Sequence, residues 1–445
     1  MGSGEMLRRV SSIVKAHPGE RVVVASAMAG VTDSILAALP RVQRDEGAIA
    51  PFLEELRSRH MQAAEEALRS PALVDEVYGE IDALLQKFER LLYGIAYTSD
   101  LTPKSKDLAL SFGERLSVRV LSAAMRDQGV DAAFRDAEHV GLVTDGTFGN
   151  ASPLMGEIQK NFDATLRPLL KGGVVPVLTG YFGVSPDGHA TTFGRGGSDY
   201  AASIVATALD AEALEVWKDV DGFLTADPRI LKDARPIREM SYDEAAELAY
   251  VGAKVLHPRT VEPVKTKGIP IFVRNTMKPE VEGTRIGPPT EARAAKLRSV
   301  ATRDGLAILR IYGPGMAYTP GIGQKVFTAL GQAKVNVYNM AASQASFALL
   351  INEEDITKGL KALEQVREGI IEYVEGLKDM TLVCVVGDIG RVEGTAGRIF
   401  SAIGHGKVNI EMISVGASEI ALNFVIRSKD KEACIRALHN EFDVE

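Results

Sequence analysis

An internal repeat limits the carboxyl-terminal third of this chain to a small number of folds. The segment GPGMAYTPGIGQKVFTALGQAKVNVYNM, which starts at Gly313, resembles GDIGRVEGTAGRIFSAIGHGKVNIEMI, which starts further along the chain at Gly387. Phe327 in the first copy matches Phe400 in the second, and Asn336 matches Asn409 by the same offset. Both copies therefore encode the same supersecondary unit.

The order of signals within each copy predicts a small α+β module. A strand is followed by a glycine-containing turn, by a helix that begins near the second glycine, and by a second strand. Two copies are too few for a solenoid. We therefore expect two modules that associate side by side, either within one chain or across a dimer.

The first part of the chain, from about residue 10 to residue 275, alternates short β-branched runs with helical patterns. Predicted strands are Arg21–Ser26, Val174–Thr179, Ala213–Trp217 and Ile269–Arg274. Apolar residues at three and four spacing predict one long helical region over Phe52–Ile95, followed by a helical stretch over Ser105–Gln128. This alternation is typical of an α/β domain with a mostly parallel sheet covered by helices.

A linker is predicted between the two parts. Residues 279–298, KPEVEGTRIGPPTEARAAKL, are rich in proline, glycine and charge and show no sustained period. We therefore expect the α/β domain over residues 1–278 and the two modules over 299–377 and 378–445.

Charge and composition exclude several classes of protein. The net charge of -8 argues against a nucleic-acid surface, because such surfaces cluster Lys and Arg. Apolar stretches fall far short of the roughly 20 residues of a membrane-spanning helix, and charged residues near the amino terminus interrupt any signal peptide. Cys384 and Cys434, with no CxxC pair, predict a reducing cytoplasm. The His residues show no metal-ligand spacing, so we expect no tightly bound transition metal.

The most informative motif is TTFGRGGSDYAAS, in which Arg195, Gly196 and Gly197 precede a helical pattern. Glycines let a backbone approach phosphate closely, and a helix amino terminus supplies free N–H groups. Ser198 or Asp199 is expected to cap that helix. A plain glycine-rich turn is the alternative for a bare GxGG, but the added Thr, Arg, Ser and Asp favour an anion site.

A second motif, SAMAGVTD, follows the first predicted strand and precedes a helix. The carboxyl ends of strands in an open α/β sheet converge on the ligand crevice, so Ser26 and Thr32 are expected to meet Arg195 around one substrate. The alternative is a helix cap by Asp33 and nothing more.

A third motif, SFGERLS, places Glu114 beside Gly113 in a helical setting. A solvated Glu–Arg pair is the default interpretation. An amino-acid substrate, however, needs an acceptor for its ammonium group and a cation for its carboxylate, and Glu114 with Arg195 would supply one of each.

The motif WKDVDGFLTADPR offers both kinds of charge in a loop that leaves a strand. These residues are Lys218, Asp219, Asp221, Asp227 and Arg229. Carboxylates can hold Mg²⁺ through water, and cations can stabilise a phosphoryl group during transfer. A simple acidic turn is the alternative, which the Asp-Pro pair favours. The segment AKVLHPRT adds Lys254, a weak signal by itself.

Taken together and in this order, these five segments resemble the aspartate kinases, members of the amino acid kinase fold, over essentially the whole chain. The stretches LTPKSKDLALSFGERLS, TTFGRGGSD and AKVLHPRT look most like the monofunctional enzymes with tandem ACT domains. The resemblance implies an amino acid kinase domain followed by two ferredoxin-like ACT modules. It also implies ATP-dependent phosphorylation of the L-aspartate side chain to 4-phospho-L-aspartate, the first step of lysine, threonine and methionine biosynthesis.

The resemblance further implies roles for individual residues. Aspartate would be bound by Thr32, Glu114, Arg195 and Ser198. ATP, with Mg²⁺, would be bound by Ser26, Gly196, Gly197, Lys218, Asp219, Arg229 and Lys254. Asp199 and Lys254 would act on the reacting groups. An effector, lysine or threonine, would contact Asn336, Asn409, Ser418 and Glu419, and the ACT modules would form a homodimer or a larger assembly.

The sequence departs from the family at its start, where members have a strand ending KFGGTSVGS and this chain reads MGSGE. An earlier start codon would supply the segment. For the chain as given we expect impaired catalysis, because the lysine of that motif stabilises transferring phosphate, and we expect an interior strand to be missing. Lys218 replaces the usual threonine, which leaves the nucleotide preference open.

Two other functions compete with this interpretation. One is a kinase of the same fold for glutamate, acetylglutamate, carbamate or UMP, which SFGERLS and the ACT pair disfavour. The other is a non-catalytic subunit that senses an amino acid. Glu114, Arg195, Asp219 and Lys254 argue against it, since they suit catalysis.

Overall fold

The computed structural model describes residues 2–252, 255–288, 297–366, 369–387, 389–390, 392–414, 416 and 418–442. The chain forms two compact units. The first contains Met1–Val220 and Arg259–Glu282, and the second contains Asp221–Pro258 and Gly283–Glu445. Each unit is described by itself.

A parallel sheet in the order β1–β3–β2 organises the first unit. Its strands are β1 (Val23–Ala25), β2 (Ala132–Arg135) and β3 (Val175–Thr179). All five residues of β3 are buried, as a central parallel strand requires. Val177 packs into one hydrophobic cluster and Leu178 into another, so apolar cores cover both faces of this sheet.

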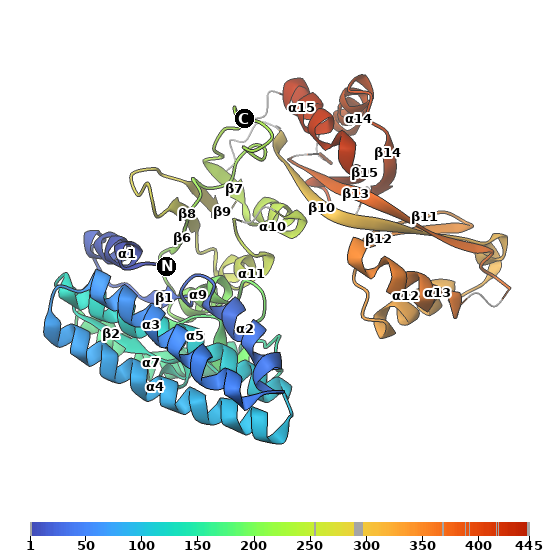
Figure 1. Ribbon diagram of the computed structural model, residues 1–445. Coiled ribbons are helices and arrows are strands. Elements are labelled where there is room, and N and C mark those ends of the chain that lie inside the picture. Colours follow the sequence, from blue (N-terminus) through green and yellow to red (C-terminus); the bar gives the residue numbers. More distant parts are fainter. Residues whose placement is uncertain are drawn as a thin grey trace. The chain divides into compact units, whose positions relative to one another are not determined.

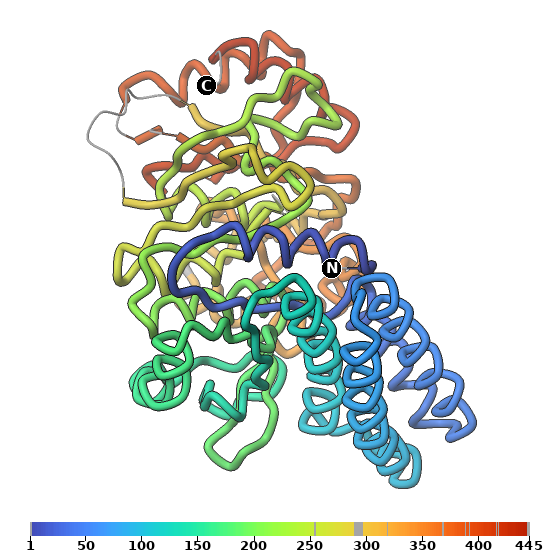
Figure 2. The backbone as a smooth tube through the Cα atoms, turned by 90° about the vertical axis from the view of Figure 1, so that its left-hand side faces the viewer, coloured from blue at the N-terminus to red at the C-terminus, as the bar shows by residue number. Residues whose placement is uncertain are grey.

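Long helices account for one of these cores. They are α1 (Gly4–Ala16), α2 (Val31–Val42), α3 (Ile49–Ala67), α4 (Pro71–Thr98) and α5 (Pro103–Asp127), with the short η1 (Glu46–Ala48) before α3 (Figure 1). Figure 2 shows α3 and α4 as neighbouring rods. The single helical region predicted over Phe52–Ile95 is divided, because Pro71 lacks an N–H donor and therefore begins a new helix. α5 is buried along most of its length.

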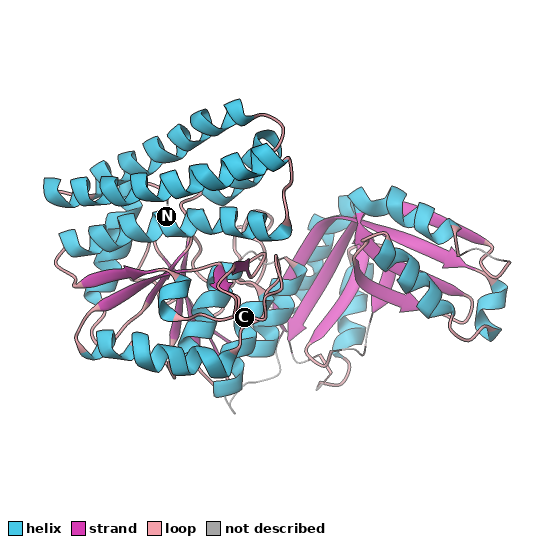
Figure 3. Ribbon diagram, turned by 90° about the horizontal axis from the view of Figure 1, so that it is seen from below, coloured by secondary structure: helices cyan, strands magenta, loops and turns pink. Residues whose placement is uncertain are grey.

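The remaining elements of this unit are helices and two further strand pairs that belong to other sheets. They are α6 (Ala137–Val140), α7 (Met155–Thr165), α8 (Arg167–Lys171), β4 (Phe182–Val184), β5 (Ala190–Thr192), α9 (Gly197–Ala208), β6 (Leu214–Lys218), α11 (Pro258–Lys267) and β8 (Ile271–Asn275). Strands β4 and β5 form an antiparallel hairpin, and β6 pairs in parallel with β8. Helices lie on both sides of the strands in this unit (Figure 3). The four predicted strands and the helix over Ser105–Gln128 are confirmed within a few residues.

The second unit begins with a parallel strand pair and a helix. These are β7 (Glu239–Ser241), β9 (Thr284–Gly287) and α10 (Tyr242–Val251). Ser241 and Glu244 form a capping box at the start of α10, with each side chain bonded to the other residue's backbone N–H.

A six-stranded sheet in the order β11–β12–β10–β13–β15–β14 makes up most of this unit. Its strands are β10 (Leu297–Tyr312), β11 (Val337–Ala342), β12 (Ser346–Asn352), β13 (Tyr373–Gly387), β14 (Ile410–Ser414) and β15 (Ala421–Arg427). Its helices are η2 (Pro314–Tyr318), α12 (Ile322–Gln332), η3 (Glu353–Asp355), α13 (Ile356–Glu364), α14 (Thr395–His405), η4 (Ser428–Asp430) and α15 (Lys431–Phe442).

The predicted repeat is confirmed, and its two copies lie side by side within one chain. Gly321 directly precedes α12 with φ 84°, and Gly394 directly precedes α14 with φ 81°. The antiparallel strands β10 and β13 lie at the centre of the shared sheet. Before Asp304, β10 pairs with the part of β13 that belongs to the second copy, so the modules exchange strands. The domain bounds expected at 278, 298 and 377 stay predictions.

In the described part of the chain, none of the helices combines the length and the apolar character needed to cross a bilayer.

Candidate active site

A buried carboxylate on α5 faces the turn that follows β1. Glu114 is 2 % exposed, and its Oε1 accepts a hydrogen bond from the backbone N of Ala27 at 3.0 Å. Gly113 permits this approach, since a Cβ there would lie 2.9 Å from the Cβ of Ala27. The interpretation as a solvated Glu–Arg pair is wrong, because Glu114 is buried and Arg115 instead binds Glu138.

The second oxygen of Glu114 is the notable polar atom of the site. Oε2 is buried and has no hydrogen-bond partner among the described residues. Burial disfavours the charged form and raises the pKa of Glu114 to about 8. A buried carboxylate with one free oxygen is suited to accept a cationic ligand group, because such a group would compensate its desolvation.

The turn after β1 is built by glycine rather than by a side-chain cap. Gly30 has φ 77° and precedes the first residue of α2, with no side-chain cap bond. The alternative that Asp33 merely caps this helix is therefore wrong. Thr32 lies half-buried in the first turn of α2, and Ser26 is exposed at the end of β1.

Residues 193–199, the glycine loop, connect β5 to α9. Gly194 and Gly196 have φ 77° and 71°, which favours glycine at both positions. Gly196 is the cap of α9 and no side chain bonds to the helix start, so the expected capping by Ser198 or Asp199 is wrong. Arg195 is exposed, and it has neither a hydrogen bond nor an ion pair to any described residue.

Gly180, which follows β3, joins the glycine loop to the turn after β1. Its backbone N donates to the carbonyl of Ala25 at 2.9 Å. A Cβ on Gly180 would lie 2.9 Å from the Cβ of Ser198 and 3.0 Å from that same carbonyl. The carboxyl ends of β1 and β3 therefore meet the amino end of α9, as the crevice argument predicts.

Tyr181 links the glycine loop to Glu114. This residue has φ 67°, unusual for a bulky side chain. A Cβ on Gly197 would lie 2.8 Å from Cδ2 of Tyr181. Burial, followed by the nearby charge of Glu114, raises the pKa of Tyr181 to about 12. The loop that carries Arg195 and the helix that carries Glu114 thus border the same tyrosine.

Two other predicted site residues pair with each other. Lys218 at the end of β6 binds both carboxylate oxygens of Asp199, with Nζ at 2.8 Å and 3.0 Å. Asp199 lies in the first turn of α9. Asp219, the next residue after Lys218, is exposed and bonds to none of the described side chains.

The geometry of this group does not test two predicted nucleotide residues. Arg229 belongs to the second unit, where it is 83% exposed and forms an ion pair with Asp227 at 2.7 Å. Lys254 lies outside the described residues.

Two anchors of the glycine loop were not predicted from the sequence. Asp107 on α5 is buried and accepts from the N of Gly149 at 2.8 Å, the N of Thr192 at 2.7 Å and Oγ1 of Thr192 at 3.0 Å. It lies about two helical turns before Glu114, so their shared helix face was the available signal. The second anchor is Arg259, in the motif AKVLHPRT.

Within this single chain, the four effector candidates do not line one common pocket, and their role stays a prediction. Ser418 and Glu419 line a pocket of about 610 Å³ together with Asp243, Glu247 and Tyr250. Asn336 and Asn409 are exposed just before β11 and β14 and do not line it.

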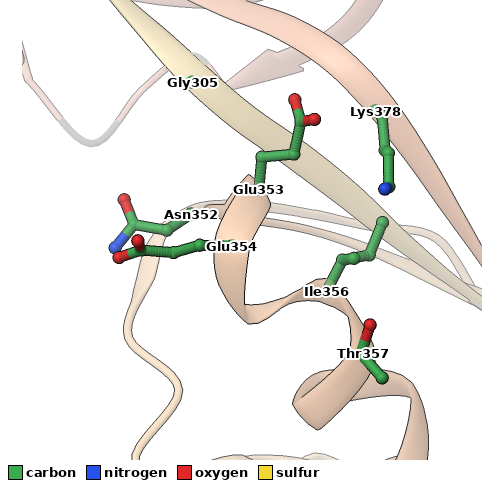
Figure 4. Close-up of a pocket in the computed structure, with 7 residues that line it drawn as sticks. All are labelled: Gly305, Asn352, Glu353, Glu354, Ile356, Thr357 and Lys378. Atoms are coloured by element: carbon green, nitrogen blue, oxygen red, sulfur yellow. The ribbon is translucent and has the colours of Figure 1, made fainter.

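A second pocket, of about 620 Å³, lies in the first copy of the repeat. It is bordered by β10, the end of β12, the start of α13 and Lys378 of β13 (Figure 4). The four effector candidates do not line this pocket.

Asp136, Glu138 and His139 form a cluster that could hold a metal ion, because their ligand atoms lie within 4.8 Å of one another. Its two carboxylates are already neutralised, since Asp136 binds Arg119 and Glu138 binds Arg115.

Comparisons with known proteins identify the families of both parts of the chain. The amino acid kinase family matches residues 1–275, and the ACT domain family matches 309–366 and 383–442. The chloroplastic aspartokinase 1 of Arabidopsis thaliana is 31% identical over 457 residues, which cover 99% of this chain and 78% of that protein.

Two crystal structures of E. coli aspartokinase III also match the chain. The complex with aspartate and ADP is 30% identical with a TM-score of 0.82, covering 99% of this chain and 97% of that chain. The complex with lysine and aspartate is 29% identical with a TM-score of 0.83, covering 99% and 96%. None of these matches supports the expectation that catalysis is impaired in this chain.

Proposed function

The chain belongs to the aspartokinases, amino acid kinases with C-terminal ACT domains, and from this premise we propose how its side chains divide the work of the reaction. It phosphorylates aspartate in the aspartate-family amino acid pathway. The alternatives of a different small-molecule kinase and of a non-catalytic subunit are therefore set aside.

Glu114 binds the ammonium group of L-aspartate. The observation that carries this proposal is the free, buried Oε2 beside the turn after β1. An ammonium group placed there would restore a partner to this oxygen and favour the ionised carboxylate. Glutamate, one methylene longer, would misplace either its ammonium or its reacting carboxylate.

Arg195 binds the α-carboxylate of the substrate, with Ser198 and Thr32 as further contacts. The exposed guanidinium has no competing partner among the described residues. Its planar group of donors matches a carboxylate with two parallel hydrogen bonds. E. coli aspartokinase III binds aspartate together with ADP, which supports a shared site for amino acid and nucleotide.

ATP donates the phosphoryl group at the carboxyl end of β6. Lys218, held by Asp199, supplies positive charge for the phosphates. The exposed carboxylate of Asp219 suits Mg²⁺, a hard cation that prefers oxygen ligands, and this ion when bound neutralises phosphate charge. Further ATP contacts proposed from the sequence are Ser26, Gly196, Gly197, Arg229 and Lys254.

The reaction proceeds by direct transfer. The side-chain carboxylate of aspartate is already ionised near neutral pH, so it needs no general base. One of its oxygens attacks the γ-phosphorus in line while the bond to the β-phosphate oxygen breaks. The protein contributes orientation, through Glu114 and Arg195, and charge stabilisation, through Lys218.

An amino-acid effector acts through the ACT modules, which also join the chain into a dimer. E. coli aspartokinase III binds lysine in its T-state crystal structure, and this supports lysine as the first effector to test. Threonine is the second.

The test of the proposed function is a steady-state assay of this chain with ATP, Mg²⁺ and either L-aspartate or L-glutamate. We expect phosphorylation of aspartate and a kcat/KM for glutamate at least about tenfold lower, the scale of discrimination for one methylene. Equal use of the two amino acids would contradict the proposed binding mode.

A further inference from the structure

Arg259, at the start of α11, donates hydrogen bonds to the first residue of the glycine loop and to the turn at residues 150–151. Its Nη1 donates to the carbonyl of Phe193 at 2.8 Å and to Oδ1 of Asn150 at 2.8 Å. Its Nη2 donates to the carbonyl of Ala151 at 2.9 Å. A single guanidinium therefore ties the beginning of the loop to the neighbouring turn at 150–151.

Aromatic packing fixes the plane of this guanidinium. The carbon Cζ of Arg259 lies 4.3 Å from the ring centroid of Tyr200 on α9. Tyr200 in turn meets the ring of Phe193 edge-on, with centroids 5.4 Å apart. Charged hydrogen bonds to carbonyls and a cation–π contact both stabilise this orientation.

Asp107 complements Arg259 with the opposite charge. The carboxylate of Asp107 accepts from the N–H groups of Gly149 and Thr192, whereas Arg259 donates to the carbonyls of Phe193 and Ala151. Asp107 therefore binds N–H groups and Arg259 binds carbonyl groups of the backbone up to Phe193.

Beyond Phe193 the glycine loop depends on these anchors. Gly194 and Gly196 flank Arg195, and glycine has more backbone freedom to lose on ordering than any other residue. The Arg195 side chain has no described partner of its own. Its position is therefore set by the fixed backbone that precedes it.

We propose that Arg259 is a positioning residue for aspartate binding: by holding the carbonyl of Phe193, it keeps Arg195 where the substrate α-carboxylate arrives. This inference rests on the proposed role of Arg195. A glycine loop that is already ordered loses no further backbone conformational entropy when aspartate binds. Arg259 therefore lowers the KM for aspartate.

The test compares the steady-state kinetics of R259Q and R259K with those of the unmodified chain. For R259Q we expect the KM for aspartate to rise about 10- to 100-fold, the scale that loss of substrate orientation produces. The kcat and the KM for ATP change far less. R259K recovers part of the loss, because an ammonium group keeps the charge but cannot reproduce the planar set of donors.

K267Q is the matched control on the same helix. Lys267 also ties α11 to the end of α9, through the carbonyl of Thr207 at 2.8 Å and the carboxylate of Asp210, but it does not contact the glycine loop. We expect K267Q to lower the Tm without changing the KM for aspartate. An equal rise in KM for K267Q and R259Q would overturn the inference, since helix docking alone would then explain it.

R195Q separates this inference from the proposed function. If R195Q raises the KM for aspartate and R259Q does not, the positioning role is wrong while the substrate site stands. If neither variant raises it, both assignments are wrong. If both raise it and K267Q does not, the inference is supported.

Discussion

At the scale of the residue, the protonation state of Glu114 is the property that most directly reports its role. In the protein without substrate, burial raises the pKa of Glu114 to about 8. Only the ionised carboxylate accepts the ammonium group of the substrate. We therefore expect kcat/KM for aspartate, which reports groups of the free enzyme, to rise as the pH increases through about 8. E114Q should lack this step. A profile with the same step in both proteins would assign it to another group.

The same shift makes a stability prediction. The pKa of Glu114 is raised above its ordinary value of 4.5, so the neutral form is favoured in the folded state. Its stabilising contribution is complete below that ordinary value and is lost as the pH rises through about 8. The Tm of the unmodified chain relative to E114Q should consequently fall over this interval. Thermal unfolding at several pH values measures the difference, and a constant difference would contradict the assignment.

Single residues also show what sequence reasoning could reach. The types and order of Glu114, Arg195 and Ser198 identified the motifs, because each motif lies within one short segment. The free oxygen of Glu114 could not be predicted, since it depends on how closely α5 approaches Ala27. Asp107 was missed for the same reason: its three partners come from residues 149 and 192.

At the scale of the element, the close contact between α5 and the turn after β1 depends on Gly113, which has no Cβ. In G113A the new methyl group would lie 2.9 Å from the Cβ of Ala27. We expect a loss of about 1–3 kcal/mol in unfolding free energy, the usual cost of overpacking, together with weaker aspartate binding. Chemical denaturation and substrate titration measure the two effects.

Gly94 provides the control for this substitution. It lies within α4, and a Cβ there would meet nothing within 4 Å. G94A should stabilise the protein by about 0.5–1 kcal/mol, because alanine has the better helix propensity. If G113A behaved like G94A, the proposed close approach would be refuted.

Elements were predicted well where periodicity was local. The strands at Val175–Thr179 and Leu214–Lys218 could be predicted, because each contains β-branched or aromatic residues in a short run that is bounded by turn signals. Helix starts were predicted less well. Gly30 and Gly196 precede α2 and α9 with positive φ and no side-chain cap, so the nearby Ser and Asp residues gave a misleading capping signal.

At the scale of the whole molecule, the two ACT copies are joined by a charged network. Glu411 on β14 accepts from Arg427 at 3.0 Å and from Arg310 on β10 at 3.1 Å. Burial raises the pKa of Glu411, but the two arginines outweigh it and lower the pKa below its ordinary value. E411Q should cost about 1–3 kcal/mol, as for a hydrogen-bonded charge that is largely removed from water.

The pH dependence of this effect has the opposite sign to that of Glu114. A lowered folded-state pKa gives stability that is present above the ordinary value of 4.5 and is lost as the pH falls. The destabilisation by E411Q should therefore fade in acid. E375Q is the control, because Glu375 also pairs with Arg310 but is 45% exposed and should contribute only about 0–1 kcal/mol. Equal effects in thermal unfolding would argue against a special role for Glu411.

The repeat predicted two modules, yet it left open whether they meet within one chain or across a dimer. The answer lies in the long pairing of β10 with β13, which joins segments that no local period relates. A search for repeats does not detect this strand exchange, because β10 ends at Tyr312, just before the first repeated segment starts at Gly313.

The central claim is that Glu114 binds the ammonium group and Arg195 binds the α-carboxylate of the same aspartate. Its most direct test is calorimetric titration, in the presence of a non-hydrolysable ATP analogue, with L-aspartate, with succinate, which lacks the ammonium group, and with β-alanine, which lacks the α-carboxylate. The account predicts that the unmodified chain prefers aspartate to both, that E114Q loses its preference over succinate, and that R195Q loses its preference over β-alanine. If both variants discriminate among the three ligands as the unmodified chain does, the claim is contradicted.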